Sequence, residues 1–262
     1  MNTVIVPVDF SGTSMNAAKY AANLLVGHYG VEMILYHAYE KESEADKCNA
    51  DLLQLKDELF ANNPVKITVY CEIASDFVEE LEKYARHRKA DLVIMGITGK
   101  SALAQVFMGS NTLKMAETKA CPVLIVPENC TFHDVKNVML ASDFKQVKAT
   151  TPSGPIKSFL KTFKPSLHIV NVDENHFVAI SEEYEKEREA FKEMFKEFSP
   201  EFYFLRLFDV EEALQLFAEE RNIDLMILIQ KINSLRHRLF TASISRKLSF
   251  QTNTVLNVFK LK

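Results

Sequence analysis

The sequence predicts an α/β fold that is built twice along the chain, with parallel strands covered by helices. Three observations predict it: strand-like apolar runs alternate with helical patterns, those runs are apolar on both faces, and the second half repeats the first. Strands that are apolar on both faces are typical of parallel sheets with helices on either side. The 262 residues are enough for two domains of about 130 residues each.

The first half of the chain predicts alternating strands and helices. Strands are expected near residues 3–9, 31–38, 66–72, 91–96 and 122–127. Helices are expected near residues 12–27, 46–61, 75–88 and 109–119. In the third helix, Phe77, Leu81 and Tyr84 recur at helical spacing, so we expect them to form its core face.

Four aspartates at element boundaries have structural interpretations. Asp76 and Asp209 each open a predicted helix, where an aspartate side chain caps free backbone N–H groups. Asp91 and Asp224 each precede a buried strand, and we expect them to bind nearby backbone amides. None of the four is therefore a candidate catalytic group.

The second half of the chain repeats the first at an offset of 134 residues, which later becomes 133. Val4–Phe10 aligns with Val138–Phe144, and Asp91–Ile94 aligns with Asp224–Ile227. Agreement over so many successive elements identifies an internal duplication.

A polar connection separates the two copies. It covers residues 128–136, so we predict domains at residues 1–130 and 135–262. Within the second copy, Pro and Gly residues at 150–155 interrupt the first helix. The charged run at 182–196 predicts a solvated helix with Phe191 and Phe195 turned inward.

Composition excludes several classes of protein. A net charge of −4 gives no reason to expect nucleic-acid binding, and no apolar run approaches the ~20 residues that cross a bilayer. The first nine residues enter a strand directly and lack a basic leader, so we expect a cytoplasmic protein. The seven histidines show no metal-ligand spacing. We expect four reduced thiols instead of a disulfide frame or a zinc site, because these cysteines are widely spaced: Cys48, Cys71, Cys121 and Cys130.

Three glycines after a buried strand predict a phosphate-binding segment. Gly96 and Gly99 follow the apolar run 91–95, and Gly109 precedes the hydroxyl residues Ser110 and Thr112. Glycine lets a ligand approach bare backbone, and the N–H groups at a helix start attract phosphate oxygens.

The second copy has lost each of these glycines. Its aligned residues are Ile229 for Gly96, Ile232 for Gly99 and Ala242 for Gly109, and Ala141 stands in place of Pro7. A β-branched side chain fills the space that a close ligand needs. We therefore expect the second domain to keep the fold and to lack the phosphate site.

Other interpretations of the same residues are weaker. Gly99-Lys100-Ser101 resembles the end of a Walker A motif, but that motif needs four residues between its glycines, and only two separate Gly96 from Gly99. Lys100 fits a loop surface near the phosphates. Asp9, at a strand end, has a structural alternative as a helix cap. For His37, packing or a backbone hydrogen bond is the expected use, and no catalytic triad or carboxylate pair stands out.

The glycine spacing and its frame resemble the nucleotide-binding universal stress proteins, the UspA-like family. The spacing Gly-x2-Gly-x9-Gly-Ser is that family's signature, and three framing segments resemble its first, second and last strands: residues 6–11, 35–38 and 121–127. The resemblance covers residues 1–127 and extends more weakly through residues 137–259. The chain therefore resembles a tandem universal stress protein.

The resemblance implies two doubly wound, Rossmann-like, five-stranded parallel-sheet domains of the adenine nucleotide alpha hydrolase-like type. It implies that Asp9 contacts the adenine, and that Gly96 and Gly99 approach the ribose and phosphates, beyond strand ends where the winding reverses. Asn111 departs from the family, which often has an apolar or hydroxyl residue there. The implied ligand-binding residues are Pro7, Val8, Asp9, Ala38, Met95, Gly96, Gly99, Lys100, Gly109, Ser110, Asn111 and Thr112.

The implied function is a stress-response protein that binds ATP or a related adenine nucleotide in its first domain only. Mg²⁺ could arrive with the nucleotide, and any hydrolysis would be slow, so an enzyme is not expected. The alternative is a non-enzymatic protein-interaction module with an empty site or another small ligand. We also expect an internal pseudo-dimer through the apolar edge strands 123–126 and 255–258. A further homodimer and the protein partner stay open.

Overall fold

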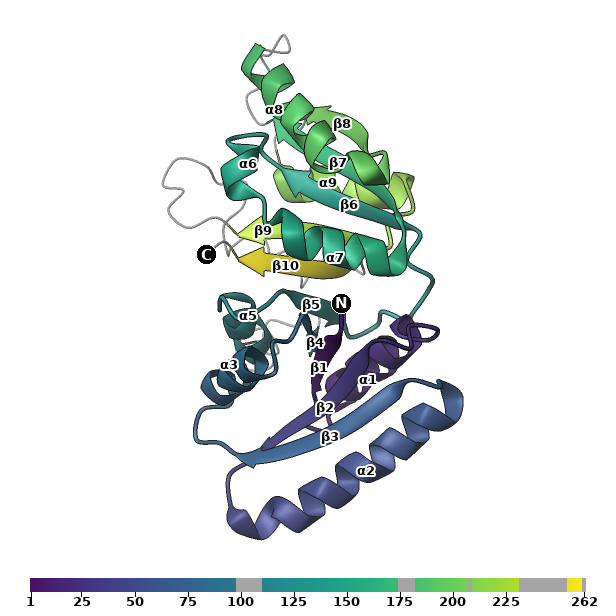
Figure 1. Cartoon of the computed structure of the whole chain (residues 1–262), viewed down its shortest axis with the longest axis vertical. Coiled ribbons are helices and arrows are strands. Elements are labelled where there is room, and N and C mark those ends of the chain that lie inside the picture. Colours follow the sequence, from purple (N-terminus) through teal and green to yellow (C-terminus); the bar gives the residue numbers. More distant parts are fainter. Residues whose placement is uncertain (98–109, 174–181, 207–208, 231–253, 261–262) are drawn as a thin grey trace. The chain divides into compact units, whose positions relative to one another are not determined.

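A computed structural model describes the chain except for residues 98–109, 174–181, 207–208, 231–253 and 261–262. The chain divides into two compact units, Met1–Phe132 and His133–Lys262. The division lies inside the polar connection between the two copies of the repeat. Strands and helices alternate in both units (Figure 1).

In the described part of the first unit, five parallel strands form a sheet in the order β3-β2-β1-β4-β5. The strands are β1 (Thr3–Pro7), β2 (Glu32–Tyr39), β3 (Lys66–Ile73), β4 (Leu92–Ile97) and β5 (Val123–Pro127). The helices are α1 (Gly12–Leu24), the short 3₁₀ helix η1 (Glu42–Glu44), α2 (Ala45–Asn62), α3 (Phe77–His87) and α5 (Ser110–Ala116). Each strand lies where the alternation of apolar runs predicts it.

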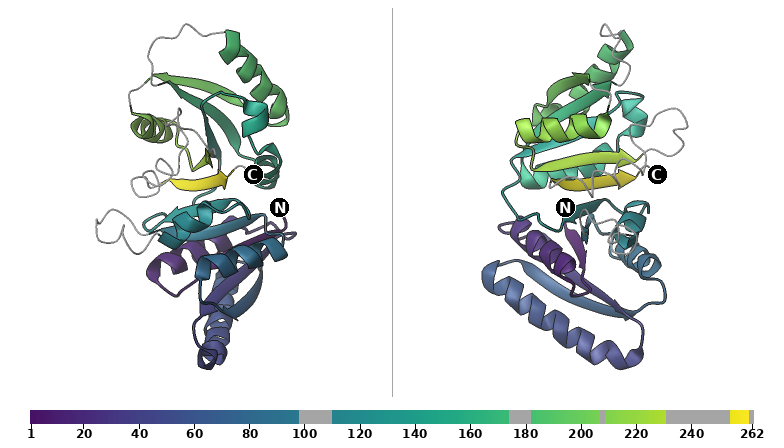
Figure 2. Two further views of the ribbon diagram at one scale, coloured as in Figure 1. Left: turned by 90° about the vertical axis from the view of Figure 1, so that its left-hand side faces the viewer. Right: turned by 180° about the vertical axis from the view of Figure 1, so that it is seen from behind.

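Helices cover both faces of this sheet, as Figures 1 and 2 show for α1 on one side and α3 with α5 on the other. The strands β1, β4 and β5 are buried along most of their length, including Val4, Ile5, Val93 and Leu124. These residues are apolar on both faces because a strand enclosed by helices meets no water on either side.

The second unit repeats the arrangement with the strand order β10-β9-β6-β7-β8. Its strands are β6 (Asn137–Ser142), β7 (Ser166–Asp173), β8 (Glu201–Arg206), β9 (Leu225–Gln230) and β10 (Val255–Lys260). Its helices are α6 (Val147–Thr150), α7 (Ser153–Phe163), α8 (Glu182–Met194), the 3₁₀ helix η2 (Lys196–Phe198) and α9 (Val210–Glu220). The order matches that of the first unit strand for strand, as a duplication requires.

Two expectations for the second copy are confirmed. The first helical segment is divided into α6 and α7, with Pro152 immediately before α7. Phe191 and Phe195 are fully buried, whereas most acidic and basic residues of α8 are partly or fully exposed. The charged run is therefore the solvated side of a helix.

The aspartate interpretations are also confirmed. Asp76 Oδ1 accepts hydrogen bonds from the backbone N–H groups of Val78 (2.9 Å) and Glu79 (3.0 Å), and Asp209 caps α9 in the same way. Asp91 Oδ2 accepts from the N–H groups of Asn2 and Thr3. Its repeat counterpart Asp224 makes the same pair of bonds to Lys136 and Asn137, each 2.8 Å long. In each copy, therefore, one carboxylate binds two backbone N–H groups at the start of the first strand, β1 or β6.

The cysteine prediction was wrong for one pair. Cys48 and Cys71 form a disulfide, whereas Cys121 and Cys130 are free. Sequence spacing did not reveal the pair, because the bond depends on how α2 packs on β3. In the described part of the chain, no helix combines the length and the hydropathy needed to span a bilayer.

Candidate functional site

The carboxyl ends of β1 and β4 form the point where the winding of the first sheet reverses. β1 pairs with β2 on one side and with β4 on the other, although β4 is the third strand after β1 in the chain. The connections that leave these two strands therefore diverge to opposite faces, which opens a crevice beyond their ends. This is where the sequence analysis expects the ligand.

Asp9 and Phe10 lie just beyond β1, after Val8, and are exposed at this edge. Asp9 Oδ1 accepts a hydrogen bond from Ser11 N–H (3.0 Å), and Asp9 N–H donates to Ser14 Oγ (3.2 Å). Burial acts to raise the pKa of Asp9, but hydrogen bonds from Ser11 and Ser14 outweigh it and hold the pKa below its usual value. Asp9 thus organises the turn into α1 as an anion.

The turn also holds Phe10 in an unusual backbone conformation. Phe10 has φ 61°, in the left-handed region, and its side chain is 36% exposed. Its ring centroid lies 5.2 Å from that of His37. A bulky residue with positive φ needs support from its surroundings. Sequence reasoning did not single out Phe10, because the pattern carries no signal for this conformation.

His37 fixes the end of β1. Its Nδ1 lies 2.6 Å from the carbonyl oxygen of Val8, and since a carbonyl only accepts, Nδ1 is the donor. The expected backbone hydrogen bond of His37 is therefore confirmed. Three of the implied ligand-binding residues near His37 differ in exposure: Pro7 and Val8 are buried, and Ala38 is partly exposed on β2.

Gly96 is required by packing inside the protein. A Cβ at this position would lie 2.5 Å from the carbonyl oxygen of Thr13 and 2.6 Å from its Cγ2. Thr13 lies in the first turn of α1. On this side of Gly96, the bare backbone meets a helix, and ligand approach is not needed to explain the glycine.

The last predicted residues link α5 to the end of β4. Thr112 is buried, and its Oγ1 donates a hydrogen bond to the carbonyl oxygen of Gly96 (2.8 Å). Met95 is buried, Asn111 is exposed, and Ser110 is the first residue of α5. Gly99, Lys100 and Gly109 lie outside the described residues, so their expected roles stay predictions.

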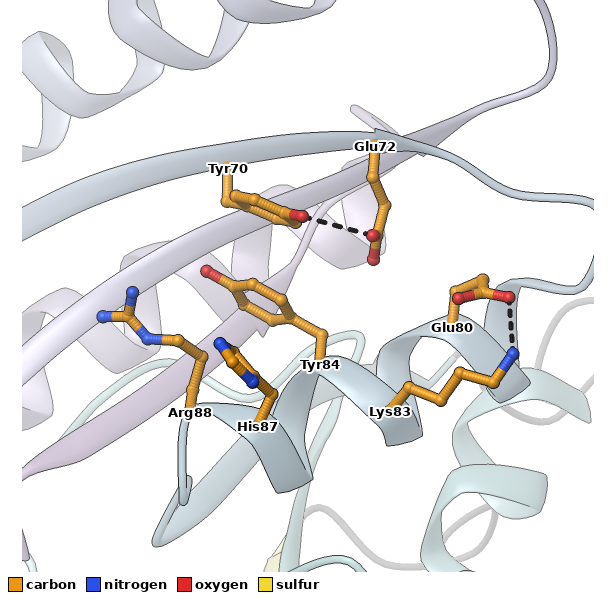
Figure 3. A pocket seen from close by; sticks show the side chains of 7 residues that line it. All are labelled: Tyr70, Glu72, Glu80, Lys83, Tyr84, His87 and Arg88. Carbon is orange, nitrogen blue, oxygen red and sulfur yellow. Dashed lines mark hydrogen bonds and ion pairs between the residues drawn. The ribbon is translucent and has the colours of Figure 1, made fainter.

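A separate pocket of about 340 Å³ lies between β3 and α3 (Figure 3). The rings of Tyr70 and Tyr84 stack in it with centroids 4.1 Å apart. Its charged groups are paired within the protein: Lys83 with Glu80 (2.9 Å) and Arg88 with Glu32 (3.0 Å). These pairs explain the arrangement without a ligand.

Phenol groups also partner Glu72, another carboxylate of this pocket. Tyr36 donates to its Oε1 (2.7 Å) and Tyr70 to its Oε2 (3.3 Å). Burial raises the pKa of Tyr36, and the hydrogen bond to Glu72 raises it further, so the phenol stays protonated as a donor. Glu72 is thus held by two phenol groups of the protein.

On the β6 side, the equivalent edge of the second unit is filled by its own side chains. Asp143 and Phe144, the counterparts of Asp9 and Phe10, are 6% and 3% exposed. Phe144 keeps the left-handed conformation (φ 52°), and its ring packs against those of Tyr184 and Phe191. The same turn therefore points an aromatic ring into the core in one copy and to the surface in the other.

Two further sets of hydrogen bonds lie at the carboxyl end of β6 in the second unit. Asn171 Nδ2 donates to the carbonyl oxygen of Ser142 (3.1 Å), which repeats the bond from His37 to Val8 with a different side chain. The carboxylate of Glu187, from α8, accepts from Val147 N–H (2.8 Å) and Gln146 N–H (3.2 Å). A side chain of the protein thus occupies the start of α6.

Comparisons with known proteins match the first unit to a known family. Residues 1–127 match the model of the universal stress protein family. A universal stress protein of Methanocaldococcus jannaschii is 27% identical over 138 residues, which are 47% of this chain and 80% of that protein. A universal stress protein of Thermus aquaticus is 28% identical over 134 residues, 47% of this chain and 97% of that protein.

In fold, the similarity extends over both units. The crystal structure of a universal stress protein from Archaeoglobus fulgidus covers 99% of this chain and 98% of its own, with a TM-score of 0.75 and 18% identity. The strand order and the crevice thus define doubly wound, Rossmann-like α/β units. The first unit matches the universal stress protein family in sequence, as its glycine segment predicts, and the fold of such a protein covers both units.

Proposed function

We propose that the first unit binds ATP or a related adenine nucleotide at the carboxyl ends of β1 and β4, and that the second unit binds none. One observation carries the proposal: Asp9 and Phe10 are exposed at this edge, whereas their counterparts Asp143 and Phe144 are buried. A ligand needs open surface at the point of reversal, and only the first unit offers it at these positions.

The ligand would lie across the crevice from the β1 side to the α5 side. Asp9 and Ala38, with the backbone of Pro7 and Val8, would border the adenine. Met95 and Gly96 would lie under the ribose, and the phosphates would meet Gly99, Lys100 and the segment 109–112. The buried Thr112, tied to Gly96, supports this arrangement because it fixes the start of α5 beside β4.

The role proposed for the nucleotide is regulatory. Binding would report nucleotide level to a protein partner, with slow hydrolysis at most and Mg²⁺ carried in by the phosphates. Micromolar affinity corresponds to roughly 8 kcal/mol, and a helix terminus supplies only about 0.3–1 kcal/mol of it. Backbone N–H groups of the glycine segment and burial of the base must supply the rest. The pseudo-dimer through strands 123–126 and 255–258 stays a prediction.

The test is a calorimetric titration of the full chain with ATP. Wild type should bind, and Gly109→Ala, which copies Ala242 of the second unit, should weaken binding at least tenfold while the protein stays folded by circular dichroism. The matched control is Ala242→Gly, which should leave the affinity unchanged. Chromatography of small molecules released by denaturing the purified protein adds a second readout. No binding would favour an interaction module with an empty site or another ligand. Equal affinity for Gly109→Ala and wild type would contradict the phosphate-binding role of the glycine segment.

A further inference from the structure

The Cys48–Cys71 disulfide joins two segments beside the proposed nucleotide site. Cys48 is the fourth residue of α2, and Cys71 lies near the carboxyl end of β3, 23 residues later in the chain. Cys48 is 4% exposed, and Cys71 is partly exposed. The bond therefore fixes the first turn of α2 to β3, and one of its two residues is partly exposed.

This bond borders the connection that leaves β2 at the site. Cys71 is paired in register with His37, which holds the Val8 carbonyl at the end of β1. Residues 40–44 lead from the end of β2 into α2, and their side chains are exposed. The connection is therefore anchored by β2 at one end and by the disulfide close to its other end.

We propose that Cys48 and Cys71 form a reversible redox latch that holds the connection 40–44 in place beside the nucleotide site. A hydroperoxide supplies the oxidising equivalents. One thiolate attacks the peroxide oxygen to give a sulfenic acid, and the second thiol displaces its oxygen as water, so two thiols and one hydrogen peroxide give one disulfide and two waters. A dithiol restores the thiols through a mixed disulfide, by attack on the sulfur of Cys71, the more exposed residue of the pair.

Among the four cysteines, only Cys48 and Cys71 form the proposed latch, and both lie in the first unit. Burial raises the pKa of Cys121 to about 12 and that of Cys130 to about 11, which keeps both thiols protonated and slow to react. In the second sheet, the strand registers place Phe204 at the position of Cys71. Oxidation therefore acts on the copy that carries the glycine segment.

The effect on binding rests on the proposed function. With the bond closed, the segment after Ala38 is held, and the ligand meets a surface that is already ordered. With the bond open, α2 can move away from β3 at its first turn, and binding has to order the connection. The oxidised protein should therefore bind ATP several-fold more tightly than the reduced protein.

Limited proteolysis tests the latch without any nucleotide. Lys41 lies in the connection and Lys47 in the first turn of α2, and both are exposed, so the rate of trypsin cleavage at these residues reports how freely this segment moves. The full chain with Cys121→Ser and Cys130→Ser is treated with hydrogen peroxide or with dithiothreitol. Mass spectrometry should locate a Cys48–Cys71 linkage only after peroxide, and reduction should speed cleavage at Lys41 and Lys47 at least fivefold.

Cys48→Ser in the same background is the matched control. It should be cleaved at the fast rate in both conditions, and its ATP affinity should not respond to peroxide. No Cys48–Cys71 linkage after peroxide, or equal cleavage rates in the two redox states, would overturn the latch. If the cleavage rates differ and ATP binds in neither state, the latch stands and the nucleotide proposal fails.

Discussion

The methyl group that Gly96 lacks would lie 2.5 Å from the carbonyl oxygen of Thr13. The end of β4 and the first turn of α1 are therefore in direct backbone contact, on the border of the proposed site. The sequence predicts that Gly96 makes room for a ligand. The contact with Thr13 gives this glycine a structural role whether or not a ligand is bound.

Gly96→Ala should consequently destabilise the first unit. The added methyl meets a backbone carbonyl that cannot rotate away, so we expect a loss of about 1–3 kcal/mol in the free energy of unfolding. Urea denaturation measures it. Gly12→Ala is the control, since a Cβ there meets nothing within 4 Å. Equal midpoints for the two variants would show that the contact with Thr13 relaxes at no cost.

The buried Thr112 gives a second prediction. Thr112→Val keeps the shape of the side chain and removes the hydroxyl that bonds the Gly96 carbonyl. We expect it to lower the free energy of unfolding by about 1–3 kcal/mol, because that carbonyl loses its hydroxyl donor. Thr112→Ser keeps the donor and should cost less. Equal midpoints of thermal unfolding for Thr112→Val and Thr112→Ser would show that the hydrogen bond to Gly96 does not stabilise the fold.

The repeat supplies its own control for His37. Asn171 makes the equivalent bond to Ser142 in the second unit, so His37→Asn should preserve the bond to Val8. His37→Leu removes it and should cost about 1 kcal/mol. Thermal unfolding of both variants compares them. A leucine variant as stable as the asparagine variant would mean that the ring of His37 contributes by packing alone.

The stability of the folded protein should depend on pH through the protonation of His168. Burial lowers the pKa of His168, with Arg221 acting in the same direction and Glu201 opposing it. The folded state therefore binds this proton less well than the unfolded chain, whose histidine pKa is about 6.5. The stability from neutral His168 is complete above that value and falls as the pH drops through the folded pKa.

His168→Ile copies Ile34, the residue aligned with it in the first unit. The variant should lose less stability than wild type between pH 8 and pH 5, measured by midpoints of thermal unfolding. The same variant compared at pH 8 alone reports the cost of the substitution itself. Parallel pH profiles for the two proteins would show that His168 does not titrate with unfolding.

Much of the fold could be predicted from local pattern, because strand and helix periodicity are properties of short segments. The caps at Asp76 and Asp209 and the bonds of Asp91 and Asp224 follow from the residue type at an element boundary. The place of the crevice was implied by the resemblance to the universal stress proteins, because ligands of doubly wound sheets bind where the winding reverses. For the site, the sequence indicates the carboxyl edge of the first sheet and its glycines. It does not indicate which side chains and backbone groups contact those glycines.

The sequence by itself determined that this chain is a duplicated α/β protein, and that one copy has lost the glycines of a phosphate-binding segment. Only the tertiary structure decided which side chains meet: Thr13 against Gly96, Cys48 with Cys71, and Phe144 in the core where Phe10 is exposed. The reason is physical. Periodicity and turn chemistry act between neighbours in the chain, whereas these contacts join segments that packing alone brings together.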